Sequence, residues 1–257
     1  MLNNKAQESP LLTATKLRKF YGEITSVNDI SLEIAQGQVL MLVGANGAGK
    51  TTLLNLLTGL VMPDRGEIRL SGRKITGLPP DQRAKRGIVK TFQLEHIFEG
   101  MTVFDNIRTT CLSAAGKHYS MFKNLDDEKE INERTEEVLS LFDLADVKYH
   151  FVRNLGHGYK KVIDIAMCFA MKPKILLVDE PTSGLSEEEK YLIMNLLMNQ
   201  IKANNLAAII VEHDLHLVKD LSKETIVMYE GEFIARGTPE DVFSQEKVVE
   251  ILVGKGF

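Results

Sequence analysis

The sequence predicts an α/β fold organised around a mostly parallel sheet, and three observations support this prediction. Short apolar runs of strand length alternate with longer segments in which apolar residues recur at helical spacing. Several of these runs end abruptly in polar or charged residues, as strands buried on both faces of a parallel sheet do. Hydrophobic residues make up 44% of the 257 residues and charged residues 26%, which suits a large globular domain or a core with a subdomain.

The first half of the chain begins with two predicted strands, from Leu11 to Phe20 and from Val27 to Ile34. A buried strand over residues 39–43, VLMLV, then breaks into a glycine-rich turn. A helix follows from Thr52 to Leu60, and its periodicity places Leu60 on the apolar face. Beyond it we expect a strand from Glu67 to Ser71, a brief helix from Pro79 to Arg86 and a strand from Ile88 to Phe92.

The middle of the chain changes character. Helical periodicity marks residues Val103 to Leu112 and Glu128 to Leu144, with a polar stretch from Ser113 to Asp127 between them. This part lacks strand signals, so we expect a helical subdomain with a mobile insertion.

The second half returns to the alternating pattern. Strands are predicted from Lys174 to Val178 and from Ala207 to Val211, on either side of a helix from Glu187 to Lys202. The pattern of that helix places Leu192 among its inward residues. A hairpin joins Ile226–Tyr229 to Glu232–Arg236, and two short helices start near Pro239 and Gln245.

These elements divide the chain into predicted domains. Residues 11–92 and 160–257 form an α/β core, and residues 93–159 form a helical subdomain with an insertion at 113–127. Residues 1–10, MLNNKAQESP, have no apolar signal-peptide core and are expected to be a flexible leader.

Composition narrows the class of protein. The net charge of −4 argues against nucleic acid as the main partner. The sequence has no run of about 18 apolar residues, so it predicts no membrane-spanning helix. Cys111 and Cys168 lie in different segments without a metal-binding spacing, so we expect reduced packing residues of a cytosolic protein.

The turn at residues 44–52, GANGAGKTT, matches the pattern G-x-x-x-x-G-K-[ST] between a strand and a helix. A chance match has a probability on the order of 1% in a chain this long. Glycines let successive backbone N–H groups face an anion, and the helix N-terminus adds positive potential. Lys50 offers a charge to β- and γ-phosphates, and Thr51 offers a hydroxyl ligand to Mg²⁺. The predicted phosphate site comprises Gly44, Asn46, Gly47, Ala48, Gly49, Lys50, Thr51 and Thr52.

Residues at other strand ends predict the rest of the site. Asp179 and Glu180 end a buried strand, where the first can hold Mg²⁺ through water and the second can polarise an attacking water. At a position that does not end a buried strand, two adjacent carboxylates would more simply be charged side chains exposed to solvent. His213 follows another buried strand and is either a γ-phosphate contact or a structural histidine. Gln93 ends a fourth strand within reach of the water or metal, and Tyr21 either stacks on a nucleobase or packs at a strand end.

A further segment at residues 154–161, NLGHGYKK, precedes Asp179 and opens an apolar helix. The order and spacing of this segment, the phosphate loop, Gln93, Asp179 and His213 resemble an ABC transporter ATP-binding subunit along nearly the whole chain. Short sequence segments within residues 90–106 and in the tail from Gly237 resemble those of the ABC transporters that take up branched-chain amino acids and related amides (urea).

This resemblance implies a P-loop NTPase (RecA-like) core with an N-terminal antiparallel β element, and ATP and Mg²⁺ as cofactors. It implies a head-to-tail pair of ATP-binding subunits, with each ATP held between one phosphate loop and the other subunit's signature. In this chain the signature positions are Gly156, His157 and Gly158. Glu180 would be the hydrolytic base, and Tyr21 would stack on adenine.

The resemblance also implies the cellular setting. Gln93 and the helical subdomain would couple to membrane permease subunits at the cytoplasmic face of the plasma membrane. A periplasmic solute-binding protein would take part indirectly.

The signature departs from the family pattern L-S-G-G-Q. Gly156 replaces its serine, His157 its first glycine and Tyr159 its glutamine, while Ser186 replaces an aspartate that usually follows Asp179. Losing the serine removes a donor to the γ-phosphate worth about 1.5–3 kcal/mol. His157 either donates in its place or sits solvated at the rim. We therefore expect a heterodimer in which a partner supplies the more regular signature.

Other functions share many of these features. An ABC exporter or lipid-extraction ATPase has the same motifs, because selectivity lies in other chains. A soluble ABC-type ATPase acting on ribosomes or DNA usually needs two modules or a long coiled coil, and this sequence has no sustained heptads. A nucleotide-dependent regulator that does not hydrolyse ATP is a further alternative, because of the irregular signature.

Overall fold

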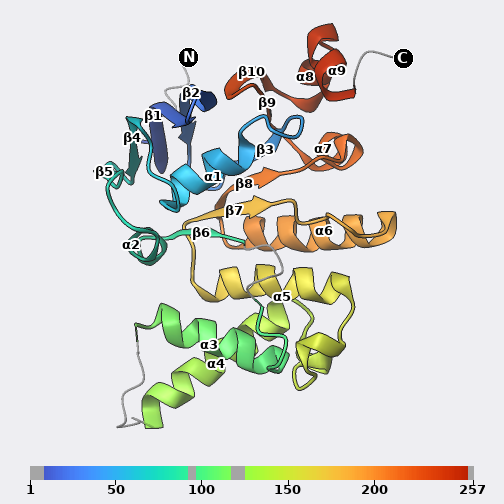
Figure 1. Ribbon diagram of the computed structural model, residues 1–257. Coiled ribbons are helices and arrows are strands. Elements are labelled where there is room, and N and C mark those ends of the chain that lie inside the picture. Colours follow the sequence, from blue (N-terminus) through green and yellow to red (C-terminus); the bar gives the residue numbers. More distant parts are fainter. Residues whose placement is uncertain (1–8, 92–96, 117–124, 254–257) are drawn as a thin grey trace, which may run out of the picture. The chain divides into compact units, whose positions relative to one another are not determined.

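A computed structural model describes residues 9–91, 97–116 and 125–253 of the chain (Figure 1). Its internal contacts divide it into two compact units. The first unit combines Met1–Arg83 with Asn205–Phe257, and the second is Ala84–Asn204.

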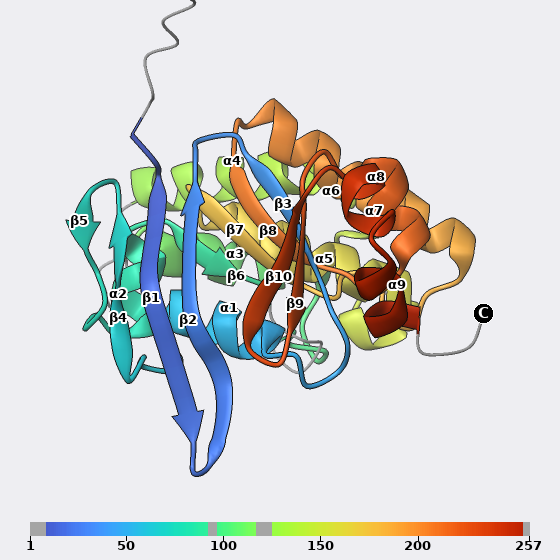
Figure 2. The same ribbon diagram turned by 90° about the horizontal axis from the view of Figure 1, so that it is seen from above.

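One sheet of the first unit is antiparallel. Its strand order is β2-β1-β4-β5, and the long hairpin of β1 and β2 is visible in Figure 2. Leu12 of β1 pairs with Ile34 of β2 on one side and Leu70 of β4 on the other, and all three side chains are buried. The strands are β1 (Leu12–Tyr21), β2 (Ile24–Ile34), β4 (Arg65–Leu70) and β5 (Arg73–Lys74).

The other strands of the first unit surround β3 (Val39–Val43). Both β8 (Ala207–Val211) and β9 (Thr225–Tyr229) pair with β3 in parallel, and β10 (Glu232–Gly237) pairs with β9 antiparallel. Every residue of β8 is buried, which explains its unbroken apolar sequence. The helices are α1 (Lys50–Thr58), α7 (Leu215–Leu221), α8 (Pro239–Phe243) and α9 (Glu246–Val253), and α2 (Pro80–Lys85) includes the passage to the second unit.

The second unit contains a parallel strand pair and a group of helices. Strands β6 (Ile88–Lys90) and β7 (Ile175–Asp179) pair in parallel. The ring of Phe142, which directly follows α4, meets the ring of Phe169 in α5 edge to face, with centroids 5.0 Å apart. The helices are α3 (Val103–Ala114), α4 (Leu125–Leu141), η2 (Ala145–Val147), η3 (Val152–Asn154), α5 (His157–Ala170) and α6 (Glu187–Ala203).

The predicted fold class and the order of elements are confirmed, but two apolar assignments were wrong. Helix α1 ends at Thr58 because Gly59 adopts φ 81° and closes it, which leaves Leu60 outside the helix with 52% of its surface exposed. Leu192 of α6 is 66% exposed, so that helix turns a narrower face inward than its sequence predicts.

Some predictions fall wholly or partly on residues that the structure does not describe. Residues 1–8 of the leader, Gln93 with the end of the strand at Phe92, and residues 117–124 of the insertion lie outside the described ranges. Ser113 belongs to α3, and α4 already begins at Leu125, so the two ends of the predicted insertion are helical. Among the described residues no helix is long and apolar enough to cross a membrane. The predicted domain boundaries stay predictions.

Candidate functional site

The phosphate loop of the first unit connects β3 to α1 and approaches its neighbours too closely for side chains. A Cβ on Gly44 would lie 2.2 Å from the carbonyl oxygen of Met228 in β9. A Cβ on Gly49 would lie 2.1 Å from the carbonyl oxygen of Ser26 in β2. Gly49 also has φ 102°, which disfavours other residues. The glycines therefore allow the loop to pack directly against two strands.

Lys50 folds back over this loop. Its Nζ donates to the carbonyl oxygens of Gly44 at 2.6 Å and Ala45 at 3.0 Å, and only 6% of the residue is exposed. The ammonium group is thus held against the backbone of the loop. An incoming phosphate would offer it stronger, charge-assisted acceptors than these carbonyls.

The start of α1 suits an anion. Its N-cap is Gly49, which has no capping side chain, and its first turn has no acidic residue. The amides of this turn therefore receive no side-chain cap, and the helix dipole adds positive potential. Thr51 is exposed, whereas the Thr52 hydroxyl accepts from Ser26 Oγ at 2.8 Å. Thr51 is the accessible hydroxyl, and Thr52 anchors the helix to β2.

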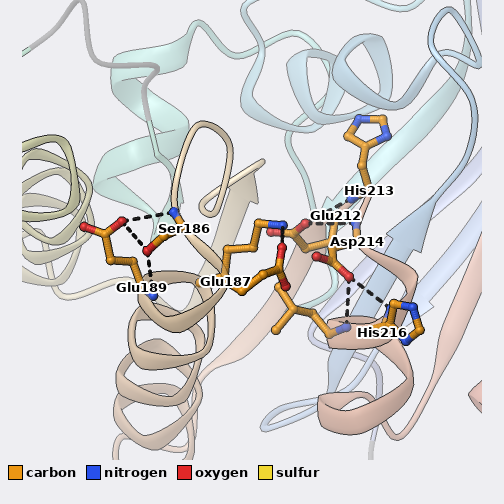
Figure 3. Close-up of polar contacts among 9 residues, drawn as sticks. Ser186, Glu187, Glu189, Glu212, His213, Asp214 and His216 are labelled. Atoms are coloured by element: carbon orange, nitrogen blue, oxygen red, sulfur yellow. Dashed lines mark hydrogen bonds and ion pairs between the residues drawn. The ribbon is translucent and has the colours of Figure 1, made fainter.

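Two other predicted residues lie in the first unit. Tyr21 ends β1 with 49% of its surface exposed, and Lys19 Nζ lies 5.6 Å from its ring centroid. Both interpretations of this ring, stacking on a nucleobase and packing at a strand end, stay predictions. His213 follows β8, is exposed, and in Figure 3 its ring extends away from the side chains of Glu212 and Asp214.

Two carboxylates organise the backbone around His213. Glu212 is 2% exposed, and its Oε2 accepts the backbone N–H of His213 at 3.0 Å and of Asp214 at 3.4 Å (Figure 3). Asp214 caps α7 by accepting the backbone N–H groups of His216 and Leu217 at 3.1 and 3.3 Å. Neither role was predicted from the sequence, although an aspartate before a helix is a recognisable N-cap signal.

In the second unit Asp179 is the last residue of β7 and is almost fully buried. Its Oδ2 lies 2.9 Å from Nζ of Lys90 in β6, with 4% and 11% of the two side chains exposed. Its backbone N–H donates to Thr91 Oγ1 at 3.1 Å. Its Oδ1 is buried and has no hydrogen-bond partner within the described part of the chain.

Glu180 follows directly and turns the chain away from the strand. It has φ 52°, a left-handed conformation that is uncommon for a residue with a side chain. Its carbonyl oxygen accepts from Lys161 Nζ of α5 at 3.2 Å and from the backbone N–H of Ser183 at 3.3 Å. Unfavourable backbone conformations of this kind concentrate at functional sites.

The signature positions lie at the start of α5. Gly156 is its N-cap and provides no side-chain hydrogen bond. His157 is exposed, and its Nε2 lies 3.2 Å from the carbonyl oxygen of Ser183, in the loop after β7. A Cβ on Gly158 would lie 3.2 Å from Glu189 Oε1. The irregular signature therefore contacts the segment that follows the two carboxylates.

Ser186 begins α6 with a reciprocal capping box, drawn in Figure 3. Its hydroxyl accepts the N–H of Glu189, whose Oε2 accepts the Ser186 N–H at 3.0 Å. The Ser186 hydroxyl and backbone N–H, with a smaller contribution from His157, lower the pKa of the Glu189 carboxyl. The pattern Ser-x-x-Glu is a sequence signal for this cap, but Ser186 was interpreted only as a departure from the family pattern.

The predicted site residues are thus divided between the two units. Tyr21, the phosphate loop and His213 belong to the first unit, and Asp179, Glu180 and the signature positions belong to the second. Gln93 lies outside the described residues. Their assembly into a single site stays a prediction.

The available donors fit Mg²⁺ only in part. Carboxylate and hydroxyl oxygens are suitable ligands, and Asp179 Oδ1 and the exposed Thr51 hydroxyl offer one each. Among the described residues no group of three His, Cys, Asp or Glu could hold a metal ion. An ion at either residue would need water or other oxygen ligands to complete its coordination, which is the usual arrangement for Mg²⁺.

Comparison with known proteins identifies the family. The family model "ABC transporter" matches residues 27–183. The chain is 32% identical over 255 residues to the high-affinity branched-chain amino acid transport ATP-binding protein BraF of Pseudomonas aeruginosa, covering 96% of this chain and 98% of BraF. It is also 32% identical over 254 residues to LivG of Escherichia coli, a protein of the same description, with the same coverage.

Solved structures of ATP-binding cassettes have a similar fold. The ADP-bound conformation of an ATP-binding cassette from an ABC transporter has a TM-score of 0.85 and 28% identity, covering 96% of this chain and 100% of that one. A nucleotide-free ATP-binding cassette has a TM-score of 0.84 and 27% identity, with the same coverage. The sequence, the fold and these relatives together show that the chain belongs to the ABC transporter family.

Proposed function

We propose that this chain binds and hydrolyses ATP as a subunit of an ABC importer for branched-chain amino acids or related small amides. The observation that carries the proposal is the phosphate loop, where Lys50 at the start of α1 folds back onto the Gly44 carbonyl oxygen of the glycine-rich turn. The names of BraF and LivG support the class of substrate.

In this proposal each predicted residue has a role. Lys50 and the first turn of α1 take the phosphates, and Tyr21 stacks on adenine. Asp179 and Thr51 hold Mg²⁺, which when bound neutralises charge on the phosphate oxygens. Glu180 orients the attacking water and accepts its proton, while His213 and Gln93 contact the terminal phosphate and the water. Gly156, His157 and Gly158 face the nucleotide of a partner subunit.

A permease surface is proposed on the second unit. Phe98, Tyr149 and Phe151 are large aromatic residues with at least two-fifths of their surface exposed. The segments that carry them are joined by backbone hydrogen bonds, including Arg153 N–H to the Glu99 carbonyl at 3.1 Å. Exposed aromatic groups of this kind mark protein interfaces. We assign this surface to membrane permease subunits, so the chain is peripheral at the cytoplasmic face of the membrane.

The proposed hydrolysis is tested on the complex assembled with its permease subunits. Glu180→Gln removes the proton acceptor, so steady-state ATP hydrolysis should fall by at least about a hundredfold while ATP still binds. Glu188→Gln makes the same change at an exposed position in the first turn of α6 and should retain activity. Undiminished turnover of Glu180→Gln would contradict the proposed role. Binding without turnover by the wild-type complex would instead indicate a nucleotide-dependent regulator.

A heterodimer with a second ATP-binding subunit is also proposed, because the signature lacks its serine at Gly156. The site that includes this signature is then the slower one. Gly156→Ser restores a hydroxyl donor and should leave the turnover of the complex equal or higher. Rapid hydrolysis by a purified homodimer with two equal sites would contradict the heterodimer.

A further inference from the structure

The turn between β9 and β10 has no role in the function proposed above, yet it contacts the phosphate loop of the same unit. Gly231 lies in this turn and is buried, although hairpin turns usually lie at the surface. Its backbone N–H donates to the carbonyl oxygen of Ala48 at 3.0 Å. Ala48 is buried and directly precedes Gly49 in the phosphate loop. A residue close to the end of the chain is therefore hydrogen-bonded to the middle of this loop.

Strand β2 holds the turn from the other side. The backbone N–H of Asn28 donates to the Gly231 carbonyl oxygen at 2.8 Å. The Asn28 side chain donates from Nδ2 to Oε1 of the next residue, Glu232, at 2.6 Å. Gly231 thus uses both of its main-chain polar groups to bridge β2 and the phosphate loop.

This close approach requires glycine at position 231. Gly231 has φ 80°, a conformation that disfavours residues with a side chain. A Cβ on it would lie 3.0 Å from the Ser26 carbonyl oxygen and 3.3 Å from the Asn28 nitrogen. The same Ser26 carbonyl oxygen leaves no room for a side chain on Gly49. The turn, β2 and the phosphate loop therefore meet around Ser26 through their backbones.

The hydrogen bond to Ala48 sets the direction of the next amide in the loop. The C=O of Ala48 and the N–H of Gly49 belong to one planar trans peptide, so they point in opposite directions. Because the Ala48 carbonyl points toward Gly231, the Gly49 N–H points away from the hairpin turn. Backbone N–H groups of a glycine-rich loop at a helix N-terminus are donors to phosphate groups. The contact with Gly231 therefore aims one of these donors.

We propose that Gly231 is a positioning residue for nucleotide binding, which acts through the Ala48 carbonyl to direct the Gly49 N–H at a phosphate group. The turn between β9 and β10 thereby preorganises the phosphate loop, so that less ordering is needed on binding. This inference rests on the proposed nucleotide function.

The first measurement is equilibrium binding of Mg²⁺-ATP to the full-length chain, comparing Gly231→Ala with Gly72→Ala. Gly72, between β4 and β5, has φ 74°, so alanine imposes a similar backbone strain there, but its Cβ would meet nothing within 4 Å. Gly231→Ala should weaken ATP binding about tenfold, because the added Cβ displaces the turn and misaligns a donor to a charged group. Gly72→Ala should bind ATP as the wild type does.

Nuclear magnetic resonance reports on the Gly49 amide itself. The pair Ala-Gly occurs in the sequence only at residues 48–49 and 115–116. Labelling alanine carbonyls with ¹³C and glycine with ¹⁵N therefore gives carbonyl-to-amide correlations for Gly49 and Gly116 alone. Saturating Mg²⁺-ADP should shift the Gly49 signal less in Gly231→Ala than in the wild type or Gly72→Ala, with Gly116 as the internal reference. A general loss of stability would leave the shift at saturation unchanged.

A second variant serves if Gly231→Ala does not fold. Asn28→Ala removes the side-chain contact with Glu232 and leaves the backbone hydrogen bonds of β2 in place. It should weaken ATP binding about threefold and reduce the Gly49 shift, because the turn is held less firmly.

An ATP affinity of the tested variant equal to that of Gly72→Ala would overturn the inference, as would an equal Gly49 shift at saturation. Either result alongside normal Mg²⁺-ATP binding by the wild type leaves the proposed function standing. A wild-type chain that binds no Mg²⁺-ATP would refute the proposed function itself.

Discussion

At the scale of single residues, Glu180 connects backbone geometry to the proposed chemistry. Its left-handed conformation directs the chain into the loop after β7, and Lys161 of α5 donates to its carbonyl oxygen. Because α5 begins at the signature, Lys161 links that helix to the proposed base. The catalytic role of the Glu180 carboxylate could be predicted from its position at a strand end. The hydrogen bond from Lys161 to the Glu180 carbonyl could not, because it joins residues that lie far apart in sequence.

Replacing Lys161 tests that link. Lys161→Met removes the donor to the Glu180 carbonyl, so Glu180 loses part of its support. The turnover of the assembled complex should fall about tenfold, because a charged hydrogen-bond donor contributes on the order of 1.5–3 kcal/mol. ATP affinity should change little, since the phosphate loop is untouched.

The adjacent lysine provides the matched control. Lys160 pairs with Glu99 instead. Lys160→Met should therefore retain most of the activity. Equal losses from the two substitutions would show that the contact with Glu180 has no special effect.

At the scale of elements, the phosphate-binding helix is held at both ends. Gly49 and Thr52 attach its start to β2, and Arg83 closes its other end. Arg83 is fully buried and donates to the carbonyl oxygens of Leu56 at 2.6 Å and Leu57 at 3.0 Å. Burial lowers the pKa of its guanidinium group to about 10, so it remains charged at neutral pH. The carbonyls at the end of α1 thereby gain a cationic cap.

Removing this cap should destabilise the chain. Arg83→Met leaves the last carbonyls of α1 buried without their donor, and we expect a loss of about 3 kcal/mol or more in the free energy of unfolding. Urea-induced unfolding measures this change in the free energy of unfolding. Arg73→Met, at an exposed position of β5, should cost under about 0.5 kcal/mol. A loss at Arg83 no larger than at Arg73 would contradict the capping role.

The start of α6 gives a second test at this scale. Ser186→Ala removes the capping box and should lower the midpoint of thermal unfolding by about 2–4 °C. Ser183→Ala, three positions earlier in the same loop, is the control, because only the carbonyl of Ser183 contacts His157. Indistinguishable midpoints for the two variants would exclude a contribution from the cap.

The same cap predicts a pH dependence. The folded pKa of Glu189 lies below its ordinary value of 4.5. Its stabilisation is therefore complete above the unfolded pKa and is lost as the pH falls through the lowered folded pKa. The difference between wild type and Ser186→Ala should narrow as the pH falls below about 4. A difference that widens with acid would contradict this sign.

At the scale of the whole molecule, the parts that sequence predicts are the local ones. Alternating apolar runs define the fold class, and the loop at residues 44–52 carries its own chemistry in consecutive residues. The contacts that sequence did not predict, of Lys90 with Asp179 and of Arg83 with Leu56, join separate segments through side chains. No local periodicity encodes such pairs. Leu60 was misplaced because Gly59 ends α1 before it, and Leu192 because hydrophobicity alone does not set how wide a buried face is.

The central claim is that the phosphate loop binds ATP through Lys50. Equilibrium binding of ATP to the full-length chain in the presence of Mg²⁺ tests it directly, comparing wild type with Lys50→Met and with the exposed control Lys74→Met. The account predicts that Lys50→Met weakens ATP binding at least about tenfold and that Lys74→Met binds as wild type does. ATP bound equally well by all three proteins, or by none of them, would contradict it.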